Sequence, residues 1–160
     1  TKGIRGTPGE LRGYFSDSNP IGTLSANVEC GVYGMMKKPL EGKAIKIAMK
    51  QDVKVGPVKI CTTISGSTPQ LYDARIEKID YRESVNSKNL VLRITDQRIL
   101  SQAGGIVQGM SGSPIIQNGK LAGAVTHVFV DDPTRGYGIF AENMLTESKT
   151  ISARENKLAS

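Results

Sequence analysis

A serine flanked by glycines stands within the longest uncharged stretch of the chain, residues 99–119. The segment over residues 109–114 reads Gly-Met-Ser-Gly-Ser-Pro. A serine nucleophile for acyl transfer must stand on a tight turn, with its own N–H and a glycine N–H two residues earlier directed at one point. Ser111 is therefore the predicted nucleophile, and the N–H groups of Gly109 and Ser111 are the predicted oxyanion donors. The uncharged surroundings keep the local dielectric low, where fixed donors act most strongly.

The neighbours of Ser111 suit such a turn. Gly109 lets the backbone approach a substrate without a Cβ, Gly112 allows an unusual dihedral after the nucleophile, and Pro114 leads the chain into a buried strand. Ser113 is a rival nucleophile, and its alternative role is that of a small residue packed under the turn. A Gly-x-Ser-Gly string also arises as a plain turn, so the string alone leaves both interpretations open.

A serine hydroxyl needs a general base, normally a histidine oriented by a carboxylate. The chain holds one histidine, His127, sixteen residues after Ser111, and its residue type allows the role of base, pocket wall or structural residue. Asp96, fifteen residues before Ser111, is the candidate for the orienting carboxylate. Its alternative role is to end a strand and make a turn with its own backbone. Two weaker candidates are Asp73 and Asp80.

Composition limits the class of protein. A length of 160 residues with 38% hydrophobic and 22% charged residues fits one globular domain and excludes a disordered tail or a collagen-like repeat. The net charge of +6 is the sole basis for a nucleic-acid binder, because the basic residues are scattered and 5% of residues are aromatic. We therefore expect no nucleic-acid partner.

Cys30 and Cys61 lack the spacing of metal ligands, so we expect no metal site. One disulfide and two buried thiols both stay open for this pair. Because the first residue is Thr1 and no signal segment follows, we expect a fragment or a processed product.

Short apolar runs rich in β-branched residues, separated by turn residues about every ten residues, predict an all-β domain. The predicted strands cover residues 11–15, 28–34, 44–49, 53–64, 72–79, 90–95, 115–116 and 121–130. Asn118-Gly119, between the last two strands, is a strong hairpin signal. A short helix is expected over residues 139–146, and the polar tail 147–160 is expected to fray. The domain is therefore placed at residues 1–146.

The nucleophile segment continues as Ile-Ile, then Asn-Gly-Lys at 118–120 and Gly-Ala-Val at 123–125. This order resembles the nucleophile segment of chymotrypsin-like serine peptidases, in particular that of the stage IV sporulation protein B family. The resemblance covers about forty residues, from Gly-Gly-Ile-Val-Gln at 104–108 to residue 140. Weaker strings at 6–10 and 31–34 resemble the same peptidase domain.

The resemblance implies a chymotrypsin-like double β-barrel, incomplete at its N-terminal side, and a serine endopeptidase that needs no cofactor. It implies Ser111 as the nucleophile and the N–H groups of Gly109 and Ser111 as the oxyanion donors. In such folds the chain order is His, Asp, Ser, so the catalytic histidine is expected upstream of Thr1. The strand after the nucleophile lines the substrate pocket, which assigns substrate contacts to Thr126, His127 and Val128.

Two positions depart from the usual pattern of that fold. The aspartate normally belongs to the first barrel, far earlier than Asp96. Met110 stands where many relatives carry Asp, so activation through a salt bridge to a new N-terminus is not expected.

The resemblance also implies partners and a place in the cell. A secreted or membrane-anchored enzyme of endospore-forming bacteria, with an upstream PDZ domain, would cleave itself and a membrane-bound regulator. This would occur in the intermembrane space of the developing spore and lead to activation of a late sigma factor. The alternative from another class is a non-catalytic peptide-binding β module that lacks the catalytic histidine.

Overall fold

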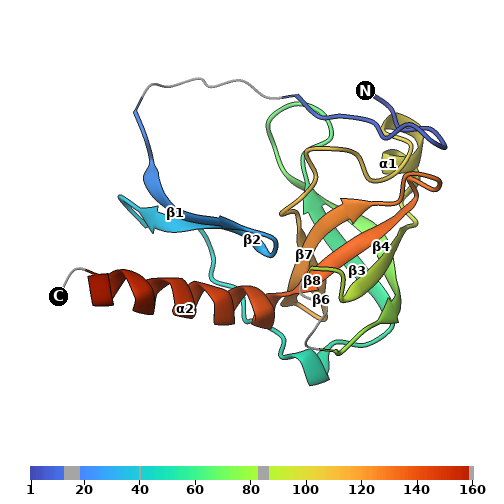
Figure 1. Ribbon diagram of the computed structural model, residues 1–160. Helices are drawn as coiled ribbons and strands as arrows, with labels where there is room; N and C mark the ends of the chain where they lie inside the picture. The colour runs from blue at the N-terminus through green and yellow to red at the C-terminus, as the bar shows by residue number, and fades with distance from the viewer. Residues whose placement is uncertain (13–18, 40, 83–86, 159–160) are drawn as a thin grey trace.

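Six antiparallel strands close into one barrel in the computed structural model, which describes residues 1–12, 19–39, 41–82 and 87–158 (Figure 1). The strands are β3 (Gly56–Thr62), β4 (Gln70–Ile79), β5 (Leu90–Ile94), β6 (Pro114–Gln117), β7 (Lys120–Val128) and β8 (Arg135–Phe140). They lie in the order β3-β4-β5-β8-β7-β6, and β6 pairs back to β3. The expectation of an all-β domain is confirmed in that the structure is mostly β, with one closed barrel among the described residues.

Alternating burial along the strands explains the barrel. On β3 and β5, and on β4 from Tyr72 to Ile76, every second residue is buried, because successive side chains of a strand point to opposite faces. Ile60 stands opposite Tyr72 on β4 and Ile115 on β6, and all three side chains are buried. The interior is thus filled by side chains rather than open, as expected for a small barrel.

The β6–β7 hairpin follows its sequence signal. Asn118 and Gly119 both adopt positive φ, 50° and 73°, which the favoured two-residue hairpin turn requires. This hairpin begins two residues after Gly112, so it fixes the strand on which the predicted nucleophile turn rests.

Strand β8 and the helices differ from the sequence predictions. Ile139 and Phe140 end β8, which was not predicted because it carries glycines at 136 and 138. A Cβ at Gly138 would lie 2.7 Å from Ile115 Cδ1, so the glycine leaves room for the core. The C-terminal helix α2 (Ala141–Leu158) is 18 residues long and includes most of the tail that was expected to fray. Helix α1 (Gln97–Gln102) was not predicted. Within the described part of the chain, no helix is long and apolar enough to cross a membrane.

A second, two-stranded sheet lies beside the barrel and α2 (Figure 1). It consists of β1 (Gly22–Val28) and β2 (Gly31–Met36), joined by a turn in which Gly31 adopts a φ of 141°. The prediction of one strand over 28–34 is therefore wrong, because a turn separates β1 from β2 there. Apolar residues on both sides of the turn made the segment look continuous in the sequence. Residues 44–49 form no strand beyond an isolated bridge from Ile47 to Leu121, followed by the short 3-10 helix η1 (Lys50–Asp52). Most of the strand predicted over 11–15 lies outside the described residues.

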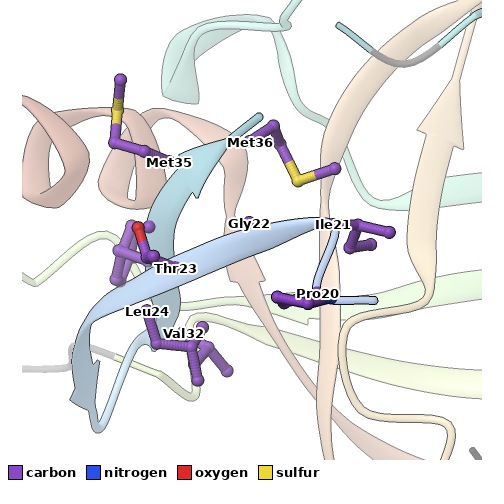
Figure 2. Close-up of a pocket in the computed structure, with 10 residues that line it drawn as sticks. Pro20, Ile21, Gly22, Thr23, Leu24, Val32, Met35 and Met36 are labelled. Atoms are coloured by element: carbon purple, nitrogen blue, oxygen red, sulfur yellow. The ribbon is translucent and has the colours of Figure 1, made fainter. Parts of the chain in front are cut away.

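This sheet carries large apolar side chains that are open to solvent. A hollow of about 510 Å³ is lined by Ile21, Leu24, Val32, Met35 and Met36 among others (Figure 2). All five side chains are exposed, Leu24 by 77%. The sheet therefore differs from the barrel, whose apolar side chains are inside.

Candidate active site

Ser111 stands on an exposed turn that is bound on both sides to β7. The Gly112 N–H donates to the Val125 carbonyl at 2.8 Å, and the Val125 N–H donates to the Ser113 carbonyl at 2.9 Å. The Ser111 hydroxyl donates to the Thr126 carbonyl at 2.7 Å. The structure therefore brings the predicted nucleophile next to Thr126, one of the predicted substrate-binding residues.

The N–H groups of the turn divide into two sets. The N–H groups of Met110, Gly112 and Ser113 donate to backbone carbonyls at 3.1, 2.8 and 3.0 Å. The N–H groups of Gly109 and Ser111 have no acceptor within the described part of the chain, and both residues are exposed. The two donors expected for an oxyanion hole are thus the two that the turn leaves available.

Buried and glycine residues hold the shape of this turn. The Met110 side chain is fully buried, and its sulfur accepts from the Val107 N–H at 3.4 Å. Gly109 and Gly112 have φ angles of 96° and 88°, a region that residues with a Cβ rarely adopt. The Met110 side chain therefore anchors the turn in the core, and the two glycines adopt the backbone angles that the turn requires.

A cavity of about 330 Å³ lies between Ser111 and the turn of the β1–β2 sheet. Thr126 and His127 line it from β7, and Glu29 and Cys30 line it from the turn between β1 and β2. His127 is exposed, and no hydrogen bond of its side chain occurs among the described residues. The structure thus places His127 on a wall shared with Ser111, without a bond between the two side chains.

A second hollow of about 880 Å³ borders the other side of the turn. Gly109, Gly112 and Ser113 line it together with Leu11 and Cys61. Gly112 also lines the first cavity, so the nucleophile turn lies between the two hollows. Cys30 and Cys61 are free thiols, half-buried, one in each hollow.

Asp96 caps helix α1. Its carboxylate accepts from the Arg98 side chain at 2.7 Å and from the backbone N–H groups of Arg98 and Asp73 at 2.9 and 3.1 Å. The Arg98 guanidinium, and after it these backbone donors, hold the pKa of Asp96 well below its usual range. This is the turn-forming role that the sequence left as the alternative. Neither Ser111 nor His127 is among these partners, and a catalytic role for Asp96 stays a prediction.

The two weaker carboxylate candidates form ion pairs elsewhere. Asp73 accepts from Lys59 at 2.6 Å. Arg82 bonds to Asp80 at 2.6 Å, and its side-chain hydrogen bonds lower the pKa of Asp80 to about 2. Among the described residues, no group of three or more His, Cys, Asp or Glu side chains is placed to hold a metal ion.

A hydrogen-bonded chain behind Ser111 was missed by the sequence analysis. The Thr126 hydroxyl donates to the Ser87 carbonyl at 2.7 Å, and the Ser87 hydroxyl donates to the Glu29 carboxylate at 3.0 Å. It connects β7 to the turn of the β1–β2 sheet beside the cavity. Ser87 and Glu29 lie in no recognisable motif, so only the tertiary structure could find them.

Comparison with known proteins identifies the family. The family model of SpoIVB peptidase S55 matches residues 1–145. The chain belongs to this family. The family resemblance seen in the Ser111 segment is therefore confirmed, and residues 1–145 belong to this peptidase family. No protein with a curated description matches the sequence.

Solved structures agree on the fold. The Rv3671c protease of M. tuberculosis, as a serine-to-alanine mutant in an inactive form, is similar with a TM-score of 0.54 and 18% identity over 82% of this chain. A second structure of that protease, also in an inactive form, has a TM-score of 0.53 and 18% identity over 81% of this chain. The match covers 65% and 66% of those two chains, slightly under two thirds of their length. The predicted chymotrypsin-like fold is confirmed.

Proposed function

We propose that Ser111 is the nucleophile of a serine endopeptidase and that the N–H groups of Gly109 and Ser111 stabilise the oxyanion. The observation that carries this proposal is the pattern of donors in the turn. Of its N–H groups, these two lack an acceptor among the described residues and are exposed beside the Ser111 hydroxyl. Fixed donors of this kind are worth about 2.7–4 kcal/mol each in the transition state of acyl transfer.

The reaction begins when the Ser111 hydroxyl leaves the Thr126 carbonyl and gives its proton to a base. Ser111 Oγ then attacks the scissile carbonyl, whose oxygen receives the two N–H groups. The released Thr126 carbonyl becomes free to accept from a substrate N–H. The bond of 2.7 Å between Ser111 and Thr126 thus marks a resting arrangement that substrate binding replaces.

The general base is a histidine outside these 160 residues, in this proposal. His127 is the single histidine of the sequence, and its side chain makes no hydrogen bond to Ser111. The 160 residues also span slightly under two thirds of the similar protease chains, which leaves room for a base elsewhere. His127 then serves as a wall of the substrate pocket.

Substrate binds as an added strand along β7. Backbone–backbone bonds from β6 and the nucleophile turn to β7 end at Val125, whereas β8 pairs with β7 as far as Val128. The backbone at Thr126, His127 and Val128 therefore lacks a partner strand on the β6 side within the described structure. An extended peptide can pair there and bring its scissile carbonyl over Ser111.

The physiological substrates are a membrane-bound regulator of sigma-factor processing and the enzyme itself, in this proposal. The support is membership of the SpoIVB peptidase family over residues 1–145. The same membership supports an extracytoplasmic location between the sporulation membranes and an upstream PDZ domain in the full-length protein.

A peptide-binding module without turnover is the competing function. It is favoured by one observation, the Ser111 hydroxyl bonded to a carbonyl rather than to a base. Proteolysis of a denatured protein substrate by the full-length protein separates the two functions. The peptidase loses turnover in Ser111→Ala and keeps it in Ser113→Ala. Turnover that survives Ser111→Ala would refute the proposed nucleophile.

A further inference from the structure

The two proposed oxyanion donors belong to two peptide units whose carbonyls are both held by hydrogen bonds. The Gly109 N–H shares a peptide unit with the Gln108 carbonyl, and the Ser111 N–H shares one with the Met110 carbonyl. All peptide bonds of the described residues are trans, so in each unit the N–H points opposite to the C=O. A bond that fixes the carbonyl therefore fixes the direction of the donor as well.

The Ser111 donor is fixed locally. The Met110 carbonyl accepts from the Ser113 N–H at 3.0 Å, within the nucleophile turn itself. This bond depends only on the turn, which β7 holds on its other side.

The Gly109 donor is fixed by a remote segment. The Gln108 carbonyl accepts from the Leu11 N–H at 2.7 Å, and the Gln108 N–H donates to the Gly9 carbonyl at 2.8 Å. Together they form a parallel bridge between Glu10 and Gln108. Residues 9–11 thus hold both the N–H and the carbonyl of Gln108 by hydrogen bonds.

The segment before residue 9 is itself hydrogen-bonded at two points, one just after α1 and one just after β7. The Gly3 N–H donates to the Ala103 carbonyl at 2.7 Å, and the Gly6 N–H donates to the Val130 carbonyl at 2.8 Å. The fit at the end of the segment is close, because a Cβ at Gly109 would lie 2.9 Å from Leu11 Cβ. Leu11 also packs against the hydrophobic core. The bonds of Gly3 and Gly6 and the close fit at Leu11 Cβ keep the Leu11 N–H in place against Gln108.

We infer that Leu11 is a positioning residue for the oxyanion hole, acting through its backbone N–H on the Gln108–Gly109 peptide. The inference rests on the proposed function of Ser111 and the Gly109 N–H. When the Leu11 bond is absent, the Gln108–Gly109 peptide can rotate about its flanking bonds, and glycine at 109 opposes this rotation less than any other residue would. The Gly109 N–H then no longer faces the substrate, although Ser111 and its own N–H stay in place.

The test uses the full-length protein and a fluorophosphonate, which reacts when Ser111 Oγ attacks phosphorus, fluoride leaves and the hydroxyl proton passes to the base. Three variants are compared. Leu11→Pro removes the N–H, Leu11→Ala keeps it but shortens the side chain, and Arg12→Pro introduces proline where no backbone bond of the N–H occurs in the described structure. If Leu11→Pro does not fold, an ester in place of the amide between Glu10 and Leu11 takes its place, because the ester also lacks the N–H.

Leu11→Pro is expected to lower the maximal rate of Ser111 modification by about 10²–10³-fold, the effect of losing one oxyanion donor, with unchanged affinity for the probe. Leu11→Ala and Arg12→Pro keep most of the rate. An equal loss in Leu11→Ala would mean that packing, not the hydrogen bond, matters, and would overturn the inference. An unchanged rate in Leu11→Pro would overturn it as well.

Crystal structures of the wild type and Leu11→Pro, or of the ester variant in its place, give a readout that does not require activity. The inference expects the Gln108 carbonyl to change direction in the variant, and the same direction in both structures would contradict it. A wild type that fails to react at Ser111 refutes the proposed function, and the two structures then decide the inference alone.

Discussion

The barrel buries its apolar side chains, whereas the β1–β2 sheet exposes them. In the barrel, Ile60, Ile76, Leu90 and Leu92 are completely buried, whereas Leu24 on the sheet is 77% exposed. The barrel closes through its own strands, while the sheet pairs only β1 with β2 among the described residues (Figure 1). The nucleophile turn is hydrogen-bonded to β7, so Ser111 is held by the part of the chain that buries its own core.

The sheet contributes to the site through its turn and the adjoining ends of β1 and β2, from Asn27 to Val32. Glu29 and Cys30 line the cavity beside Ser111, whereas the exposed Met35 and Met36 lie at the far end of β2 (Figure 2). The difference implies that stability and catalysis respond differently to changes in the two regions.

The largest effect on stability is expected in the barrel. Ile76→Ala removes a fully buried side chain from β4 and leaves a cavity, which typically costs about 2–5 kcal/mol. Urea unfolding followed by circular dichroism measures this loss. A change below about 1 kcal/mol would mean that the barrel core is not the main source of stability.

An intermediate effect is expected at the end of the barrel, where Asp96 caps α1. Asp96→Asn keeps a residue that can cap a helix but removes the charge that binds Arg98, so we expect a loss of about 1–2 kcal/mol near neutral pH. The lowered pKa of Asp96 means that the folded state favours the ionised carboxylate. The contribution of Asp96 to the free energy of unfolding is complete at pH values above the ordinary pKa range of carboxyl groups. It is lost as the pH falls toward the pKa of Asp96 in the folded state.

Unfolding of wild type and Asp96→Asn at pH 7 and pH 3 therefore measures a difference that shrinks at the lower pH. A difference of equal size at both values would contradict the ion pair as its cause. Turnover measured on the same samples tests the catalytic prediction for Asp96. A loss of turnover far larger than the loss of stability would support that prediction.

The smallest effect is expected on the sheet. Leu24→Ser replaces an exposed side chain on β1 and should change the free energy of unfolding by no more than about 0.5 kcal/mol. Ile76→Ser is the matched change in the barrel, where the hydroxyl would be buried. Similar losses for the two variants, in the protein as isolated, would show that the Leu24 face is covered and would end the contrast between the regions.

The sequence predicted the barrel better than its surroundings for a physical reason. Strands β4 and β5 alternate buried and exposed residues, and their predicted limits, 72–79 and 90–95, differ by two residues or fewer from Gln70–Ile79 and Leu90–Ile94. Strand β8 has glycines where the core needs space, so its apolar pattern is weak. Helix α2 is mostly polar, and its residues gave no periodic signal.

The candidate site also has a part that the sequence predicted and a part that it did not. Ser111 and its two donors follow from local spacing of glycine and serine, because the turn that holds them is local. The bonds of Gln108 to Gly9 and Leu11 join backbone groups, which side-chain types do not encode. The chain of bonds from Thr126 through Ser87 to Glu29 likewise depends on tertiary contacts between separate segments.

The most direct test of the central claim is the site of fluorophosphonate attachment in the full-length protein, determined by intact mass and peptide mapping. We predict one adduct on Ser111, lost in Ser111→Ala and retained in both Ser113→Ala and His127→Ala. An adduct on Ser113 would contradict the assignment of the nucleophile. Loss of labelling in a folded His127→Ala protein would contradict the assignment of the base to a histidine outside this chain.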